Sequence, residues 1–149
     1  MPRLYLDTNV FIAAFEGVDG RSDAARGLLG MLDALPSLHG VTSLLTLAEL
    51  LVRPLRDRDQ ELAELYRTIL TGTDRFTVTN VTRDVLEAAA DLRAQYGLLK
   101  LPDAIHVATA KLTACEGVVS ADARLRLPPG MALIDLDAAA IANATRSPT

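Results

Sequence analysis

Four acidic side chains are the residues in this sequence best suited to chemistry. Asp7 and Asp122 each follow a short apolar run, and Glu49 and Asp103 lie within helical patterns. Clustered carboxylates repel one another, and oxygen ligands of this kind are the usual way to hold Mg²⁺ or Mn²⁺. Such a site suits phosphodiester hydrolysis, because metal ions screen an anionic substrate, activate water and stabilise the leaving oxygen.

Each acid taken alone also has an ordinary structural explanation. An Asp after a strand commonly forms a turn or caps the next helix, and Asp103 in a first helical turn is favoured by the helix dipole. Glu49 differs, because apolar residues surround it from Leu44 to Val52. It should be at least half buried and need a cation, a metal or a shared proton, unless it is the solvent-facing residue of that helix.

Short apolar runs alternate with helical patterns along the chain, which predicts the elements that position these acids. The expected strands are Leu4–Leu6, Gly40–Thr42, Phe76–Val78, Val118–Val119 and Ala132–Ile134. The expected helices are capped by Ser22, Ser43 and Thr82 or begin near Asp59 and Pro102, with Pro54 stopping the second of them. Parallel neighbours need crossover connections, so the pattern predicts an α/β fold, a three-layer α/β/α sandwich. In such sheets ligands gather beyond the carboxyl ends of strands, where the strand order reverses.

Composition predicts one folded domain over residues 1–143, followed by a loose tail at 144–149. With one cysteine and no apolar run long enough to span a membrane, we expect a cytoplasmic protein that does not bind membranes. The net charge of −4 gives no global attraction to nucleic acid, so RNA must be bound locally. Arginines are the candidate contacts, chiefly Arg124 and Arg126, although a solvated surface explains most arginines equally well; the wider set adds Arg53, Arg56 and Arg75.

The acids lie in four motifs that together resemble the PIN-domain family, and the short chain is similar to its VapC-type toxins. The motifs are Leu6–Val10, Thr46–Leu50, Leu101–Ala108 and Ser120–Asp122, and the resemblance covers nearly the whole chain. It implies a PIN-like sandwich with a five-stranded parallel sheet. It also implies an Mg²⁺- or Mn²⁺-dependent endoribonuclease, the toxin of a toxin–antitoxin pair, that forms a homodimer and binds a cognate antitoxin.

By this resemblance Asp7, Glu49, Asp103 and Asp122 are the catalytic, metal-binding set. Asn9 and Ser120 match polar positions that help to orient the set. Ala121 stands where the family often has Asn or Thr, which leaves open whether one metal ion or two are held.

Two other functions remain possible for this set of acids, and His106 lies beside one of them. A haloacid-dehalogenase-like phosphatase would use Asp7 as nucleophile, but Asn9 stands where that chemistry needs a second acid. A PIN-like interaction module without activity is the non-enzymatic alternative. His106 shares a helix face with Asp103, and we interpret it as a structural histidine with local partners. Repulsion among the acids further predicts that Asp7→Asn leaves the metal-free fold at least as stable.

Overall fold

The computed structural model describes residues 2–146, in which five parallel strands form one sheet. The strands are β1 (Arg3–Leu6), β2 (His39–Ser43), β3 (Phe76–Thr79), β4 (Gly117–Ser120) and β5 (Ala132–Asp135). Their spatial order is β3-β2-β1-β4-β5, with every neighbouring pair parallel. The predicted α/β class and all five predicted strands are therefore confirmed.

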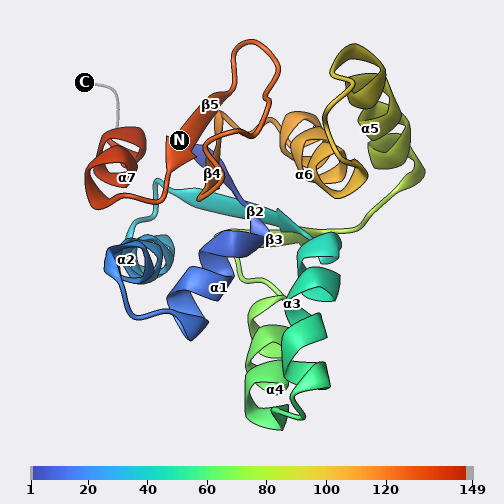
Figure 1. The fold of residues 1–149 in the computed structure, drawn as a ribbon. Coiled ribbons are helices and arrows are strands. Elements are labelled where there is room, and N and C mark those ends of the chain that lie inside the picture. Colours follow the sequence, from blue (N-terminus) through green and yellow to red (C-terminus); the bar gives the residue numbers. More distant parts are fainter. Residues whose placement is uncertain (1, 147–149) are drawn as a thin grey trace.

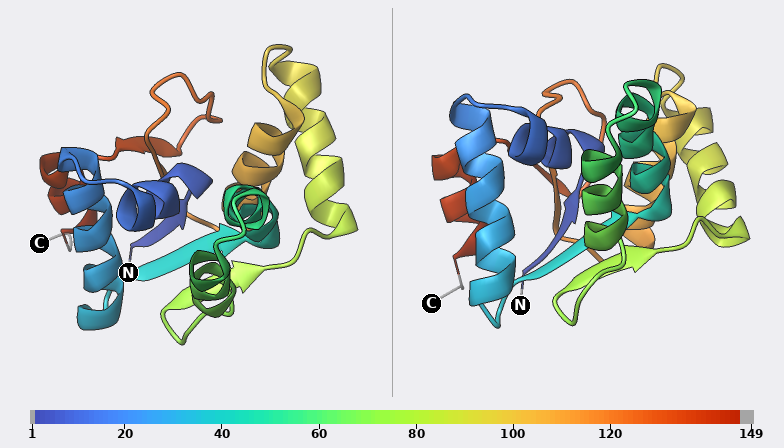
Figure 2. Two further views of the ribbon diagram at one scale, coloured as in Figure 1. Left: turned by 60° about the horizontal axis from the view of Figure 1, so that its bottom comes forward. Right: turned by 90° about the horizontal axis from the view of Figure 1, so that it is seen from below.

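Seven helices in the described residues surround this sheet. They are α1 (Thr8–Glu16), α2 (Gly20–Ala34), α3 (Leu44–Arg56), α4 (Gln60–Ile69), α5 (Arg83–Gln95), α6 (Leu101–Leu112) and α7 (Ala138–Thr145). Helices α1, α2 and α7 cover one face and α5 and α6 cover the other, while α3 and α4 project together from the body (Figure 1). Two further views in Figure 2 show the same three layers and the same projecting pair.

The side chains of β1 divide the core into two layers, because successive residues of a strand point to opposite faces. Leu4 and Leu6 pack with α1 and α2, whereas Tyr5, between them, packs with α5 and α6. All three side chains are buried, and Tyr5 and Leu6 are fully so. A strand covered on both faces is the usual condition of a parallel sheet, and it fixes Asp7 at the end of a rigid element.

Several boundaries differ from those the sequence predicts. Helix α2 begins at Gly20 and is capped by Asp19, whose side chain accepts from the Ser22 backbone N–H, so Ser22 is not the cap. Pro54 does not stop the second predicted helix; α3 continues to Arg56 with Pro54 buried inside it. A proline removes one helical hydrogen bond, and the packing of α3 against α4 outweighs that loss here.

Two helices, α1 and α7, have no counterpart in the sequence prediction. Helix α7 reaches Thr145, so the segment expected to be a loose tail begins inside a helix, and Ala144 packs against the core. Residues 147–149 lie outside the described residues. Between residues 2 and 146, no helix combines the length and the hydropathy that crossing a membrane requires.

Candidate metal-dependent nuclease site

The candidate site lies beyond the carboxyl ends of β1 and β4. The chain leaves β1 toward β2 and β3 on one side and returns to β4 and β5 on the other, so the strand order reverses between these two strands. Asp7 directly follows β1, and its backbone N–H donates to the Val119 carbonyl of β4 at 3.0 Å. Ser120 ends β4, and Asp122 lies two residues beyond it. The topology thus brings the first and last motifs together at the place where open α/β sheets bind ligands.

Asp7 combines a structural role with its place in the acidic set. It is the N-cap of α1, and its Oδ1 accepts from the Thr8 backbone N–H at 2.8 Å. Its Oδ2 accepts from the Ser120 hydroxyl at 2.8 Å and from the Asn9 amide at 3.4 Å. The side chain is 12% exposed. Asp7 is therefore both a helix cap and a member of the acidic set held in place by hydrogen bonds.

Asn9 and Ser120 connect the start of α1 to the loop after β4. The Asn9 amide donates to the Ser120 Oγ at 3.1 Å, and its carbonyl oxygen accepts from the Ala121 backbone N–H at 3.0 Å. Ser120 Oγ also accepts from the Asp122 backbone N–H at 3.1 Å. These bonds place Asp7 and Asp122 relative to each other; the orienting role of Asn9 and Ser120 stays a prediction.

Glu49 reaches the site from α3, and its partners come from α1 and α6. Its Oε1 accepts from the Thr8 hydroxyl at 2.8 Å and bonds to the His106 Nε2 at 2.5 Å. Its side chain is 36% exposed, as expected of a half-buried carboxylate. Burial raises the pKa of Glu49, but the hydrogen bonds from His106 and Thr8 outweigh burial and hold the pKa below its usual value. The charge is thus stabilised by donors supplied from two other helices.

Asp103 lies in the first turn of α6, and its surroundings disfavour its charge. Burial raises its pKa first, the negative charges of Asp7, Asp122 and Glu49 raise it further, and His106 offsets them only in part. A carboxylate with this electrostatic environment is stabilised by any cation placed among the four acids. The other three predicted acids therefore all lie close enough to Asp103 to raise its pKa.

The donor set fits a hard divalent cation. Carboxylate oxygens are the preferred ligands of Mg²⁺ and Mn²⁺, and the four acids contribute them from the residue after β1, from α3, from α6 and from the loop after β4. Within residues 2–146, no three His, Cys, Asp or Glu side chains approach closely enough to form a ready-made metal site. Asp7 and Glu49 are each held by hydrogen-bond donors of their own.

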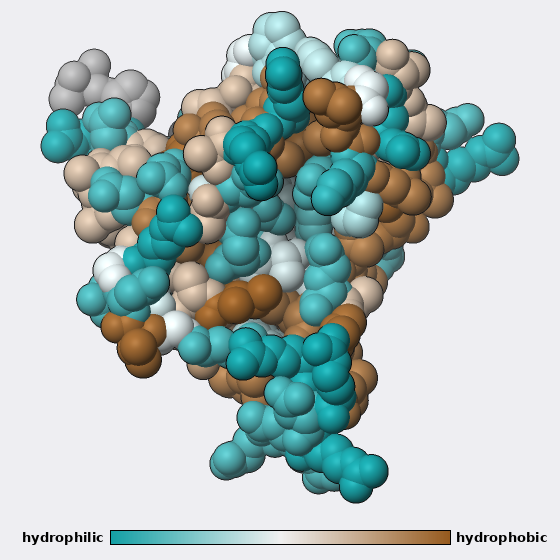
Figure 3. Space-filling view, viewed as in Figure 1, coloured by the Kyte–Doolittle hydropathy of each residue, from teal (hydrophilic) through white to brown (hydrophobic). Residues whose placement is uncertain are grey.

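A cavity of about 480 Å³ opens beside Asp103 and Asp122. Its lining joins these acids to basic and apolar residues, namely Leu98, Leu99, Lys100, Arg124, Leu125 and Arg126. Hydrophilic residues gather across the hollowed middle of the face shown in Figure 3. Arg124 Nε lies 3.6 Å from Asp122 Oδ1, and its side chain is 94% exposed. The two arginines predicted as substrate contacts thus border the acidic set.

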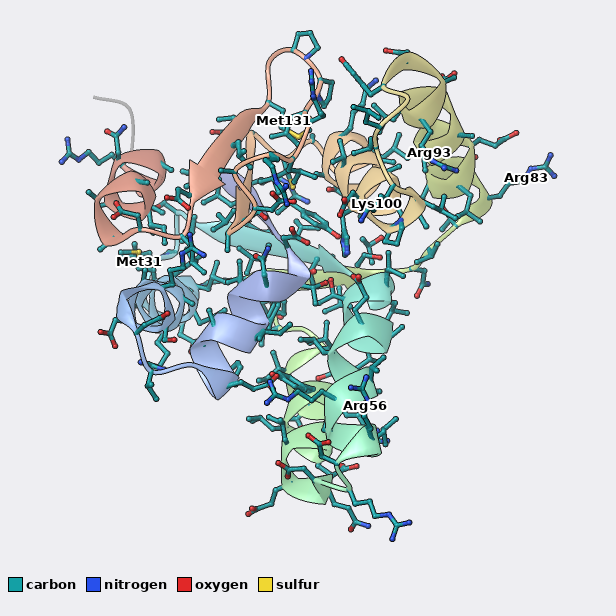
Figure 4. The ribbon with its side chains drawn as sticks, viewed as in Figure 1. Met31, Arg56, Arg83, Arg93, Lys100 and Met131 are labelled. Carbon is teal, nitrogen blue, oxygen red and sulfur yellow. The ribbon has the colours of Figure 1, made fainter. Side chains whose placement is uncertain are left out.

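Lys100 is a basic residue of this cavity that the sequence analysis missed. It reaches toward the middle of the face in Figure 4, whereas Arg83 on α5 points away from the body. The sequence offered one signal for Lys100. It directly precedes the motif that begins with Leu101 and Pro102, so it must lie beside the same site. The cavity therefore carries three cations beside two carboxylates.

The other candidate arginines are not part of this cavity. Arg53 forms ion pairs with Glu16 at 3.4 Å and Asp57 at 3.8 Å. Arg56 lies on projecting α3, as Figure 4 shows. Arg75 precedes β3, and its guanidinium donates to the Asp33 carbonyl at 2.8 Å. Arg75 is therefore at the amino ends of the strands, opposite the site, and its role as a substrate contact stays a prediction.

His106 is buried and has local partners, as its structural interpretation requires, yet one of those partners belongs to the site. It is 2% exposed, and its Nδ1 lies 2.6 Å from the Tyr5 hydroxyl. Its Nε2 contacts Glu49 and lies 3.9 Å from Asp7 Oδ1. The sequence placed His106 one turn from Asp103 but could not show that α3 brings Glu49 to it.

Comparisons with known proteins agree with this geometry. The PIN domain family model matches residues 4–130 of the chain. No curated protein matches it. A toxin–antitoxin complex from Klebsiella pneumoniae is 29% identical, with a TM-score of 0.64 over 86% of this chain and 94% of that one.

Two further solved structures share the fold at lower identity. VapC20 of Mycobacterium tuberculosis, a sarcin–ricin loop cleaving toxin, is 20% identical, with a TM-score of 0.67 over 82% of this chain and 92% of that one. VapBC2 from Rickettsia felis, bound to a DNA fragment of its promoter, is 18% identical, with a TM-score of 0.67 over 89% and 98%. With the family match spanning most of its length, the chain belongs to the PIN domain family.

Proposed function

We propose that this chain is a metal-dependent endoribonuclease and the toxin of a toxin–antitoxin pair. The observation that carries the proposal is that four acids meet at one edge of the sheet in a chain of the PIN domain family. Burial and the charges of Asp7, Asp122 and Glu49 raise the pKa of Asp103, so a cation placed among these acids would be stabilised. Perturbed carboxyl groups of this kind cluster at functional sites.

The residues that would hold Mg²⁺ or Mn²⁺ are Asp7, Glu49, Asp103 and Asp122. When bound, the cation supplies positive charge for the scissile phosphate and acidity for an attacking water. The hydrogen bonds of Asn9 and Ser120 hold Asp7 and Asp122 in place relative to each other.

Binding of RNA falls to the cations of the adjacent cavity. Lys100, Arg124 and Arg126 lie beside Asp103 and Asp122, so they can hold the phosphates that flank the cleaved bond. A net charge of −4 provides little general attraction to RNA. We therefore propose cleavage at one or a few sites of a structured RNA, where exposed loop bases and shape supplement a few phosphate contacts.

The proposed partners follow from the toxin–antitoxin neighbours. A cognate antitoxin and a second copy of the chain are the partners we propose, with the cytoplasm as the place of action. The Klebsiella pneumoniae neighbour is a toxin–antitoxin complex, and the Rickettsia felis neighbour is a toxin–antitoxin pair on DNA. These neighbours support an antitoxin; the homodimer rests on the resemblance to VapC-type toxins.

The decisive experiment combines cleavage with end mapping. The purified chain is incubated with total RNA in Mn²⁺, in Mg²⁺ and in EDTA, and new 5′ ends are sequenced. We expect a few discrete cuts that EDTA and Asp103→Asn abolish. Uniform degradation of unrelated RNAs would overturn the selective mode, and metal-independent cuts that survive Asp103→Asn would overturn the site.

The same preparation tests the two alternatives. Turnover of a phosphomonoester with a trapped aspartyl-phosphate on Asp7 would favour the phosphatase. Asn9 argues against it, because its amide bridges Ser120 and Ala121 and cannot protonate a leaving group. Absence of Mn²⁺ binding by calorimetry at millimolar metal would favour the inactive interaction module.

A further inference from the structure

A buried polar row connects the interior of the sheet to the acidic site. It runs from Tyr5 on β1 through His106 on α6 to Glu49 on α3. Tyr5 is fully buried and His106 is 2% exposed, and their rings meet edge to face at 5.7 Å. Two polar groups buried this deeply are costly unless each is satisfied. The metal-binding role given to the acids does not by itself account for them.

The hydrogen bonds of the row hold the His106 ring at both nitrogens. A carboxylate can only accept, so the His106 Nε2 donates to the Glu49 Oε1, as the Thr8 hydroxyl does. On the other side of the ring, Nδ1 is hydrogen-bonded to the Tyr5 hydroxyl at 2.6 Å. Tyr5 thereby fixes the orientation of the histidine that holds Glu49.

Both hydrogen bonds to Glu49 end on the same oxygen of its carboxylate. Thr8 and His106 both bond to Oε1, at 2.8 Å and 2.5 Å, so these two bonds leave Oε2 to other partners. Two donors from different helices on one oxygen fix the plane of the carboxylate. Ligating carboxylates elsewhere are commonly oriented by such outer hydrogen bonds, whose loss weakens metal binding.

We infer that Tyr5 and His106 are positioning residues that hold Glu49 through its Oε1, so that its Oε2 would be available to a divalent cation. The inference rests on the proposed metal-dependent function and specifies how this chain prepares one ligand. His106 contacts Glu49 directly, and Tyr5 acts through His106.

Tyr5→Phe tests the inference with the smallest change, because it removes one hydroxyl and keeps the buried ring. We expect about tenfold weaker Mn²⁺ binding by calorimetry. Tyr66→Phe is the matched control: Tyr66 is also fully buried, and its hydroxyl donates to a carboxylate, Glu16, at 2.5 Å. That control should bind Mn²⁺ like the wild type. Equal Mn²⁺ affinity of Tyr5→Phe and the wild type would overturn the inference.

A second variant separates positioning from packing. The amide of His106→Gln can still donate to Glu49, whereas His106→Leu cannot. We expect Mn²⁺ affinity in the order wild type, His106→Gln, His106→Leu, with metal-free melting temperatures recorded alongside. Equal affinity of the Gln and Leu variants would show that His106 does not act through its hydrogen bond.

The nitrogen of the His106 ring that carries a proton can be identified in the wild type itself. Long-range ¹H–¹⁵N spectra should show the His106 ring protonated at Nε2 without metal and after addition of Mg²⁺. A ring protonated only at Nδ1, or a change of tautomer on adding Mg²⁺, would contradict the inferred role. A wild type that binds no Mn²⁺ would instead refute the proposed function, so the two failures are distinguishable.

Discussion

Replacing Glu49 by Gln should destabilise the metal-free protein, whereas Asp103→Asn should stabilise it. Each change substitutes an amide of nearly the same size, so packing is retained. The signs differ because Glu49 is held by donors from Thr8 and His106, while burial and negative charge surround Asp103. The pair of variants therefore tests the electrostatics of the site before any metal is added.

The size of the Glu49→Gln effect follows from its two hydrogen bonds. A bond to a charged group contributes about 1.5–3 kcal/mol and a neutral one about 0.5–1.5 kcal/mol, so two weakened bonds lose about 2–3 kcal/mol. The Glu49 side chain is 36% exposed, and solvent screening together with relief of the repulsion on Asp103 reduces the net loss to about 1 kcal/mol. For a chain of this length that lowers Tm by about 3–4 °C.

The two variants should change stability with opposite signs, and both changes should depend on pH. The lowered pKa of Glu49 stabilises the fold above its ordinary value of 4.5, and this stabilisation is lost as pH falls through the lower folded pKa. The raised pKa of Asp103 destabilises the fold at neutral pH, and that penalty is relieved as pH falls toward the ordinary value of 3.8. The loss of stability in Glu49→Gln and the gain of stability in Asp103→Asn, each relative to the wild type, should thus both shrink as pH falls.

Thermal melts followed by circular dichroism in EDTA, from pH 7 down to about pH 3, measure both effects, because this range includes the ordinary pKa values of 4.5 and 3.8. Glu87→Gln is the control for loss of an exposed charge, since Glu87 is 68% exposed on its side chain and only weakly paired with Arg83. It should change stability by less than about 0.5 kcal/mol. An unchanged or higher Tm for Glu49→Gln at pH 7, or a lower Tm for Asp103→Asn, would refute the reasoning.

Two further predictions concern activity. Asp7→Asn should abolish cleavage and, contrary to the expectation from repulsion alone, lower the metal-free stability by about 1 kcal/mol, because an NH₂ group would replace the Oδ2 that accepts from the Ser120 hydroxyl and the Asn9 amide. A melt without metal that shows a gain would restore the repulsion argument. Arg124→Ala should reduce the cleavage rate without lowering Tm. The difference in rate from the wild type should narrow as salt rises, because one lost phosphate contact flattens the salt dependence of RNA binding. Rates across a salt series, with exposed Arg83→Ala as control, measure this, and a deficit that is constant with salt would remove Arg124 from the RNA contacts.

The sequence was sufficient to predict the sheet and the residues that gather at its edge. Short apolar runs separated by helical patterns require crossover connections, so the parallel sheet follows from local signals. The places of Asp7 and Asp122 follow as well, because each comes just after a strand whose carboxyl end must lie at the same edge. Local patterns failed where packing prevailed, as at Pro54, which α3 accommodates by packing against α4.

Only the tertiary structure decided what each acid contacts. Sequence patterns predicted that Glu49 needs a partner but could not identify His106, which is 57 residues away on α6. They also could not show that Asp7 is a cap held by Ser120, 113 residues along the chain, or that Lys100 shares a cavity with Arg124. Strand and helix formation depend on neighbours within a few residues, whereas hydrogen-bond partners and charge environments depend on how distant elements pack. The sequence therefore determined which residues reach this edge of the sheet, and packing determined the hydrogen-bond partners and the electrostatic surroundings that they meet there.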